Sequence, residues 1–60
     1  MTHDSAFQRA LQLSLEKEIN YVVYRSEMND YGAMPLDLYE GYSSDILAEF
    51  SMGIRVDNNR

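Results

Sequence analysis

Apolar positions recur with helical spacing in two segments of the chain, and a short polar break separates them. The apolar stripe of the first segment comprises Phe7, Leu11, Leu15, Ile19, Val22 and Val23. Most of its steps are of three or four residues, which places the side chains on one side of an α-helix. Residues 10–15 also alternate as a strand would, but the stripe is longer than that alternation. The pattern therefore predicts a helix over about residues 5–29.

The start of this helix stays open on sequence grounds. Ser5 is a candidate N-cap, because Gln8 lies three residues later and would complete a capping box. Asp4 is an alternative cap, whose carboxylate would favour the positive end of the helix. A later start at Ser14 would place Glu16 in the first turn.

A second helix is predicted over about residues 35–52, after a turn at 30–34 that is rich in turn-forming residues. Pro35 suits the first helical position, where its missing N–H costs nothing. The apolar stripe of this helix comprises Leu36, Tyr39, Tyr42, Ile46, Leu47 and Phe50. Gly53 favours an end just before it, followed by a short tail; alternatively, residues 54–60 extend the helix by a turn.

The first predicted helix is apolar on a second side as well, at Ala10, Leu13, Tyr21, Tyr24 and Met28. A helix with two apolar sides packs against more than one neighbour, and the second helix can cover only one of them. We therefore expect an all-α fold, a single helical-hairpin domain over 1–60 that dimerises into a four-helix bundle. Alternatively, the tyrosines are half-exposed and keep their hydroxyl groups in water. The residues expected in the core or at the dimer contact are Leu15, Ile19, Val22, Val23, Tyr24, Tyr42, Ile46 and Phe50.

Chain length and composition also favour association. A chain of 60 residues buries only about 60% of the surface that its unfolded form exposes, and small proteins compensate with disulfides, metals or oligomerisation. The sequence has no cysteine and a single histidine, His3, so it offers neither a disulfide nor a recognisable metal site. Oligomerisation is the remaining option, and we expect no cofactor.

The formal net charge is −5, and the acidic residues are unevenly placed. Between Ser26 and Ile54 there are six acidic residues and no base. Nucleic acid and anionic membranes are therefore unexpected partners, because phosphate contacts need lysine and arginine. Such a stretch is most often a solvated helix face; alternatively, it is directed at a basic partner. A signal-peptide pattern and a membrane-length apolar run are both absent, which predicts a cytoplasmic protein.

No set of residues suggests catalysis. The glycines do not form a phosphate-binding loop, and no cysteine is available as a nucleophile. Ser43 and Ser44 lack a plausible triad, because His3 lies far from them in the chain. Carboxylate pairs such as Glu40 and Asp45 are common on acidic helices and are weak evidence of a site. We therefore expect a non-enzymatic protein.

Residues 13–19, Leu-Ser-Leu-Glu-Lys-Glu-Ile, resemble the first helix of the phycobilisome-degradation proteins of the NblA family, which opens with Leu-Ser-Leu-Glu. Further positions that continue the family pattern are Val22, Tyr24, Met28, 34–37, Tyr42 and 45–47. The resemblance extends over about residues 13–52. Pro35 departs from it, because the family has a capping serine there.

The resemblance implies a helical hairpin that dimerises into a four-helix bundle. It also implies a non-enzymatic adaptor in the cyanobacterial cell, one that binds phycobiliproteins of the phycobilisome and promotes their disassembly and degradation by a Clp-type chaperone-protease. A short, divergent member would fit a cyanophage-encoded copy. The family contacts phycobiliprotein through a leucine and a lysine, and no residue here aligns with that lysine. Met52, Ile54, Arg55 and Val56 are the partner contacts expected instead.

Two other functions stay open on sequence grounds. The acidic stretch would suit an inhibitor that mimics nucleic acid or blocks a basic enzyme surface. The chain would also suit an antitoxin-like or purely structural dimer. A charge mimic should lose affinity steeply as salt is added, whereas an adaptor held by apolar contacts should lose less.

Overall fold

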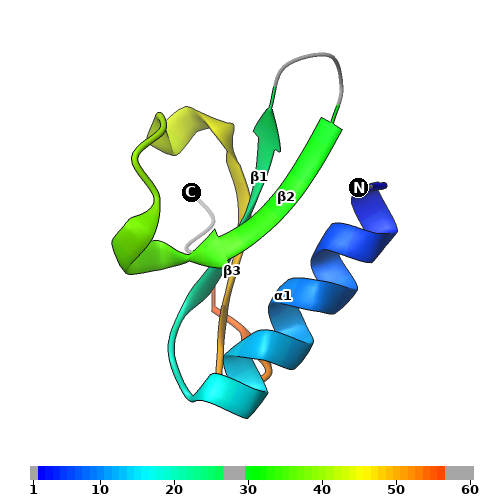
Figure 1. Cartoon of the computed structure of the whole chain (residues 1–60), viewed down its shortest axis with the longest axis vertical. Helices are drawn as coiled ribbons and strands as arrows, with labels where there is room; N and C mark the ends of the chain where they lie inside the picture. The colour runs from blue at the N-terminus through cyan, green and yellow to red at the C-terminus, as the bar shows by residue number, and fades with distance from the viewer. Residues whose placement is uncertain (1, 27–29, 57–60) are drawn as a thin grey trace.

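The computed structural model describes residues 2–26 and 30–56, and in this part of the chain one helix packs on a four-stranded antiparallel sheet (Figure 1). The main elements are α1 (His3–Lys17), β1 (Tyr21–Ser26), β2 (Asp30–Pro35), β3 (Ile46–Ser51) and β4 (Ile54–Arg55). Two single-turn 3-10 helices, η2 (Leu36–Leu38) and η3 (Ser43–Asp45), lie between β2 and β3. The strand order is β2-β1-β3-β4. The fold is therefore α/β, and the predicted all-α hairpin and four-helix bundle are wrong.

The helix α1 is shorter than the sequence pattern predicts. Thr2 is its N-cap, and the Thr2 hydroxyl accepts a hydrogen bond from the Ser5 backbone N–H at 3.2 Å. None of the three predicted starts is used. Glu18 ends the helix in the left-handed conformation, with a φ of 58°. The predicted helix end at 27–29 lies outside the described residues. No helix in the described part is long and apolar enough to cross a membrane.

Strand β1 replaces the second half of the predicted first helix. Its first four residues, Tyr-Val-Val-Tyr, are aromatic and β-branched, which favours a pleated strand. Tyr21, Val22 and Val23 are all buried, so both faces of the strand are covered. A strand covered on both faces reads as a continuous apolar run, and periodicity does not separate such a run from a buried helix. This ambiguity explains why the residues of β1 were predicted to belong to a helix.

The predicted second helix is replaced by the 3-10 helices η2 and η3 and by strand β3, and β4 follows it. Pro35 closes β2, and the next residue, Leu36, donates its backbone N–H to the carbonyl oxygen of Asn20 at 2.9 Å. β3 pairs antiparallel with β1, with an irregularity in register between Val23 and Tyr24. Met52 and Gly53 then form a two-residue turn into β4, with φ values of 54° and 79°. The structure of residues 46–51 therefore depends on their pairing with β1, which is distant in sequence.

The core between α1 and the sheet depends on small helix residues. Ala6, Ala10 and Ser14 are fully buried, and their spacing of four residues forms one narrow stripe. The sheet residues buried on this side are Tyr21, Val23, Ala48 and Phe50. Because the stripe has short side chains, the helix lies close to the sheet. Phe7 and Leu13 pack partly buried against the core from the flanks of α1, whereas Leu11 and Leu15 stay exposed.

The residues predicted for the core or dimer contact are divided between buried and exposed positions. The buried or partly buried ones are Val22, Val23, Tyr24, Ile46 and Phe50. The exposed ones are Leu15, Ile19 and Tyr42, with exposed fractions of 56%, 44% and 78%. Leu15 lies beside the stripe that faces the sheet, Ile19 lies just beyond the end of α1, and Tyr42 belongs to the connection between β2 and β3.

The connection 36–45 lies on the sheet face opposite α1 (Figure 1). Tyr24 of β1 contacts Tyr39 of this connection, with ring centroids 5.4 Å apart. Gly32 of β2 makes room for the Tyr24 ring, because a Cβ at Gly32 would lie 2.5 Å from the Tyr24 hydroxyl oxygen. The described chain thus has three layers: the helix, the sheet and an ordered connection.

Candidate functional site

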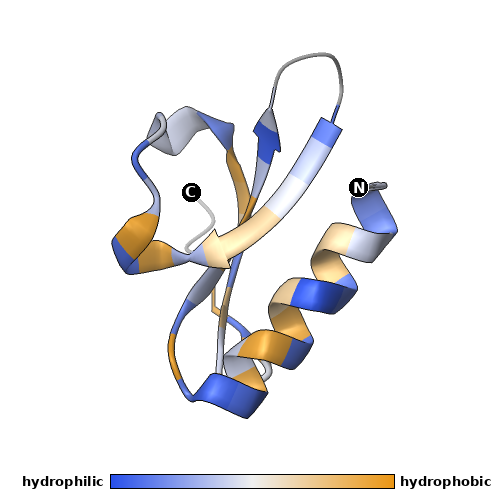
Figure 2. Cartoon of the chain, viewed as in Figure 1, coloured by the Kyte–Doolittle hydropathy of each residue, from blue (hydrophilic) through white to orange (hydrophobic). Residues whose placement is uncertain are grey.

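Residues 36–45, which we call the acidic segment, form a surface of one charge sign. The acidic residues of the region 30–54 are Asp30, Asp37, Glu40, Asp45 and Glu49. No basic residue occurs between 30 and 54. Glu27, the first acid of the predicted stretch, lies outside the described residues. Figure 2 shows that strongly hydrophobic positions are interspersed with polar ones along the acidic segment.

Hydrogen bonds order the backbone of the acidic segment. In η2, the Tyr39 N–H donates to the Leu36 carbonyl oxygen at 3.2 Å, and in η3 the Asp45 N–H donates to the Tyr42 carbonyl oxygen at 3.0 Å. The Tyr39 hydroxyl also donates to the Tyr42 carbonyl oxygen, at 2.8 Å. Gly41 leaves room for the Tyr39 ring in this bond, because a Cβ there would lie 2.5 Å from the Tyr39 hydroxyl oxygen.

The surroundings of Tyr39 disfavour ionisation of its hydroxyl, so its pKa is raised. Burial raises the pKa of Tyr39 above its ordinary value of 10.0, and the negative charges of Asp45 and of ionised Tyr24 raise it further. A protonated hydroxyl can donate to the Tyr42 carbonyl, whereas a phenolate cannot. Burial and the Asp45 carboxylate therefore extend the range in which this hydrogen bond can form to more alkaline pH.

Two large apolar side chains project from this ordered backbone. Tyr42 is 78% exposed and Leu38 is 63% exposed. Tyr42 is the N-cap of η3, with an extended backbone, and Asp45 ends that helix. The hydrogen bond from the Tyr39 hydroxyl therefore fixes the backbone from which the exposed Tyr42 ring projects.

The basic residues of the described chain lie elsewhere. Arg9 and Lys17 are on α1, on the other side of the sheet, and Arg25 is near the end of β1. Arg55 of β4 lies on the α1 side too, because its guanidinium carbon is 5.5 Å from the centre of the Phe7 ring. The sheet therefore separates an acidic face from a face of mixed charge.

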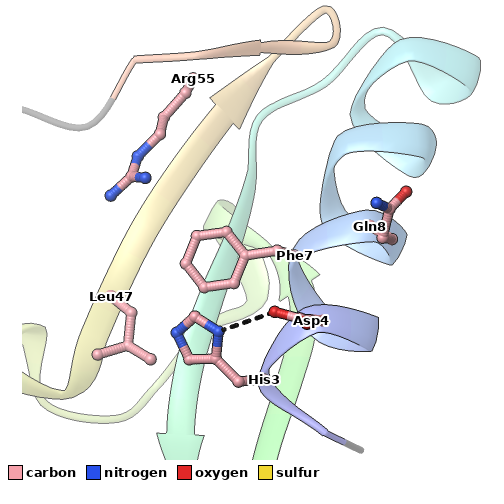
Figure 3. Close-up of a pocket in the computed structure, with 6 residues that line it drawn as sticks. All are labelled: His3, Asp4, Phe7, Gln8, Leu47 and Arg55. Atoms are coloured by element: carbon pink, nitrogen blue, oxygen red, sulfur yellow. Dashed lines mark ion pairs between the residues drawn. The ribbon is translucent and has the colours of Figure 1, made fainter.

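A cavity of about 580 Å³ opens between the first turns of α1 and the strands β3 and β4 (Figure 3). Its lining residues are His3, Asp4, Phe7, Gln8, Leu47 and Arg55. The His3 ring stacks on Phe7 with centroids 4.5 Å apart, and His3 Nδ1 lies 3.6 Å from a carboxylate oxygen of Asp4. Figure 3 shows the Arg55 side chain extending along the opposite wall from β4.

The chemistry available in this cavity is limited. Its lining includes no hydroxyl or thiol that His3 could activate as a nucleophile. Within residues 2–26 and 30–56, no group of three or more His, Asp or Glu side chains is placed to hold a metal ion. The stacking of His3 and the position of Arg55 over Phe7 serve to pack the N-terminal turn of α1 on the sheet.

The four residues predicted as partner contacts do not form one surface. Met52 lies in the turn, and Ile54 and Arg55 form β4. The Val56 N–H donates to the Glu49 carbonyl oxygen at 2.8 Å and continues the pairing. Because side chains alternate along a strand, Arg55 points to the α1 side whereas Ile54 and Val56 point to the other.

The sequence did not predict that Leu38 is an exposed apolar side chain of the acidic segment, because the helical pattern placed residues 35–52 in a helix. The available signal was the density of turn-forming residues: Pro35, Gly41, Ser43 and Ser44 all fall within ten positions.

Comparison of the chain with known protein families, with curated proteins and with solved structures gave no match.

Proposed function

We propose that the chain is a non-enzymatic binding protein that uses the acidic segment to occupy a basic surface of another protein. The separation of charge across the sheet carries this proposal, since the region 30–54 has only acidic residues whereas Arg9 and Lys17 lie on the α1 side. A surface of one sign attracts a partner of the opposite sign and speeds association.

The exposed apolar side chains would slow dissociation from the basic partner, in addition to the fast association that the charges give. Charge pairs at the rim of an interface add little affinity, whereas buried aromatic anchors dominate it. Tyr42 and Leu38 are available for this role, and the bonds of Tyr39 hold the backbone between them. A segment that is ordered before binding loses less conformational entropy on binding.

The adaptor function toward phycobilisomes stays a prediction, and the fold gives it no added support. The segment 13–19 that carries the resemblance spans the end of α1 and the loop after it, and 34–37 spans the end of β2 and η2. The experiment below therefore tests binding to phycobiliproteins as an alternative to binding a basic protein surface.

The test compares two variants with the same change in net charge. One removes the charges of the acidic segment (Asp37→Asn, Glu40→Gln, Asp45→Asn), and the control removes three exposed acids of the α1 side (Asp4→Asn, Glu16→Gln, Glu18→Gln). Titration calorimetry measures binding to an oligolysine peptide over a range of salt concentrations. We expect steep salt dependence for the unmodified chain and a loss of at least tenfold in affinity for the first variant only.

Equal weakening of the two variants would refute the proposal, because net charge alone would then explain binding. A pull-down of assembled phycobilisomes provides the competing arm. Retention of phycobiliprotein by both the unmodified chain and the variant without the charges of the acidic segment would favour the adaptor function instead.

A further inference from the structure

The outer edge of β2 is built to pair with another strand. β2 stands at one end of the strand order β2-β1-β3-β4 (Figure 1), and its register with β1 runs from Asp30 to Pro35 without an irregularity. Proteins usually protect an edge strand with a lysine, a bulge or a proline within it. This strand has none of the three, because the region 30–54 has no basic residue and Pro35 is the last residue of β2.

The hydrogen bonds between β1 and β2 show which backbone groups face this outer edge. The Leu36 N–H donates to the Asn20 carbonyl oxygen, one step beyond the last pair of the two strands. Pairs in an antiparallel ladder alternate between hydrogen-bonded and non-hydrogen-bonded ones. The β2 residues in the non-hydrogen-bonded pairs, whose N–H and carbonyl groups point away from β1, are Tyr31, Ala33 and Pro35. Pro35 has no N–H to lose at its outward position, where a sheet tolerates proline.

One face of this edge strand adjoins the acidic segment. Side chains alternate along a strand. Tyr31 and Ala33 pack against the core on the α1 side, so Met34 lies on the opposite face, which the acidic segment shares. Asp37 follows the end of β2 by two residues and is exposed. A basic side chain on this face of an added strand therefore projects toward carboxylates.

The other face of the edge is apolar. Phe7 and Leu13 lie on opposite flanks of the small-residue stripe of α1, and the Phe7 ring contacts Phe50 of β3. Leu13 is therefore on the flank nearer β2. Arg9 and Glu16, which are four and three residues from Leu13, lie on the same side of the helix and are exposed. Because these two charges are opposite in sign, this face favours an apolar side chain over a basic one.

We propose that β2 pairs with an extended segment of the partner protein, in which basic residues alternate with apolar ones. This inference rests on the proposed function and specifies the form of the basic surface. The apolar residues lie opposite Tyr31 and Ala33 and exchange backbone hydrogen bonds with them. The basic residues between them project toward the acidic segment. A second copy is a poor occupant, because antiparallel pairing of two β2 strands would place both acidic segments on the same face of one sheet.

Two pairs of peptides test this pairing with the unmodified chain. In the first pair, Lys-Val-Lys-Val-Lys-Val-Lys is compared with Lys-Lys-Val-Val-Val-Lys-Lys, which has the same composition and charge. Titration calorimetry should show binding about tenfold tighter or more for the alternating peptide. In the second pair, the alternating peptide is N-methylated at two valines or at two interior lysines. Methylation at valine should weaken binding about tenfold or more, because two hydrogen bonds to β2 are lost, whereas methylation at lysine should leave it unchanged.

Amide hydrogen exchange locates the contact by nuclear magnetic resonance. We expect slower exchange of the Tyr31 and Ala33 N–H groups when the alternating peptide is bound. Equal binding within each peptide pair, with unchanged exchange at these two groups, would overturn this inference and leave the proposed function standing. If neither peptide of the first pair binds, both fail. Protection of these groups in the free chain that rises with chain concentration would show that a second copy occupies the edge, and would also overturn the inference.

Discussion

Among the described residues, Ser14 is the one buried polar side chain, and it connects α1 to the turn between β3 and β4. Its hydroxyl donates to the Leu11 carbonyl oxygen at 2.8 Å and accepts from the Gly53 N–H at 2.9 Å. In Ser14→Ala the Gly53 N–H loses its partner in a part-buried contact, which costs about 1–3 kcal/mol. The higher helix propensity of alanine offsets about 0.5 kcal/mol of this. We therefore expect a net loss of roughly 0.5–2.5 kcal/mol in the free energy of unfolding.

Urea and thermal unfolding followed by circular dichroism measure this loss. In a domain of this size, each kcal/mol lowers Tm by about 4–8 °C. Ser5→Ala is the matched control, because Ser5 lies on the same helix, is exposed and contributes only its backbone N–H to the cap, which alanine retains. Its stability should equal or slightly exceed that of the unmodified chain. If Ser14→Ala unfolds at the same Tm as Ser5→Ala, the bond to Gly53 contributes nothing and its proposed role in the core is refuted.

Three further substitutions, the last compared by its pH dependence, test other contacts of the fold. Gly32→Ala should destabilise the chain by about 1–3 kcal/mol in urea unfolding, because its Cβ would displace the Tyr24 ring; unchanged stability would show that the ring moves freely. Gly53→Ala should cost about 1 kcal/mol, since its φ of 79° is strained for any residue with a Cβ, and an unchanged urea midpoint would contradict this. The raised pKa of Tyr39 predicts stability that is fully present below its ordinary pKa of 10.0 and lost as pH rises through the higher folded value. Tyr39→Phe should lessen that alkaline loss, and an unchanged pH profile would assign it to other groups.

The sequence identifies α1, but it shows neither the end of this helix nor the strands beyond it. Residues 5–17 are common to the predicted and observed helices, because the apolar residues in this segment do follow helical i+4 spacing. The pattern assigns the wrong side of that helix to the core, since it weights Leu11 and Leu15 above Ala6 and Ala10. Hydrophobicity alone favours the larger side chains, whereas close packing of a helix on a sheet favours the smaller ones.

The sequence did not predict the strands β1 and β3, because neither has a local pattern that distinguishes it from a helix. β1 is buried on both faces, so it lacks the alternation that marks a strand. β3 depends on pairing with β1, more than 20 residues away, and Phe50 is buried because it lies opposite Tyr21. The acidic character of 30–54 was visible in the sequence, but its concentration on one side of a sheet required the fold.

The small side chains of the core also determine where binding can occur. The small side chains of Ala6, Ala10 and Ser14 form the helix side of the core, so several large apolar side chains stay outside it. Leu15 is left on the flank of α1 and Tyr42 on the opposite layer, and each is exposed by more than half. Because the sheet lies between them, a basic partner bound at Tyr42 would leave the flank of α1 uncovered.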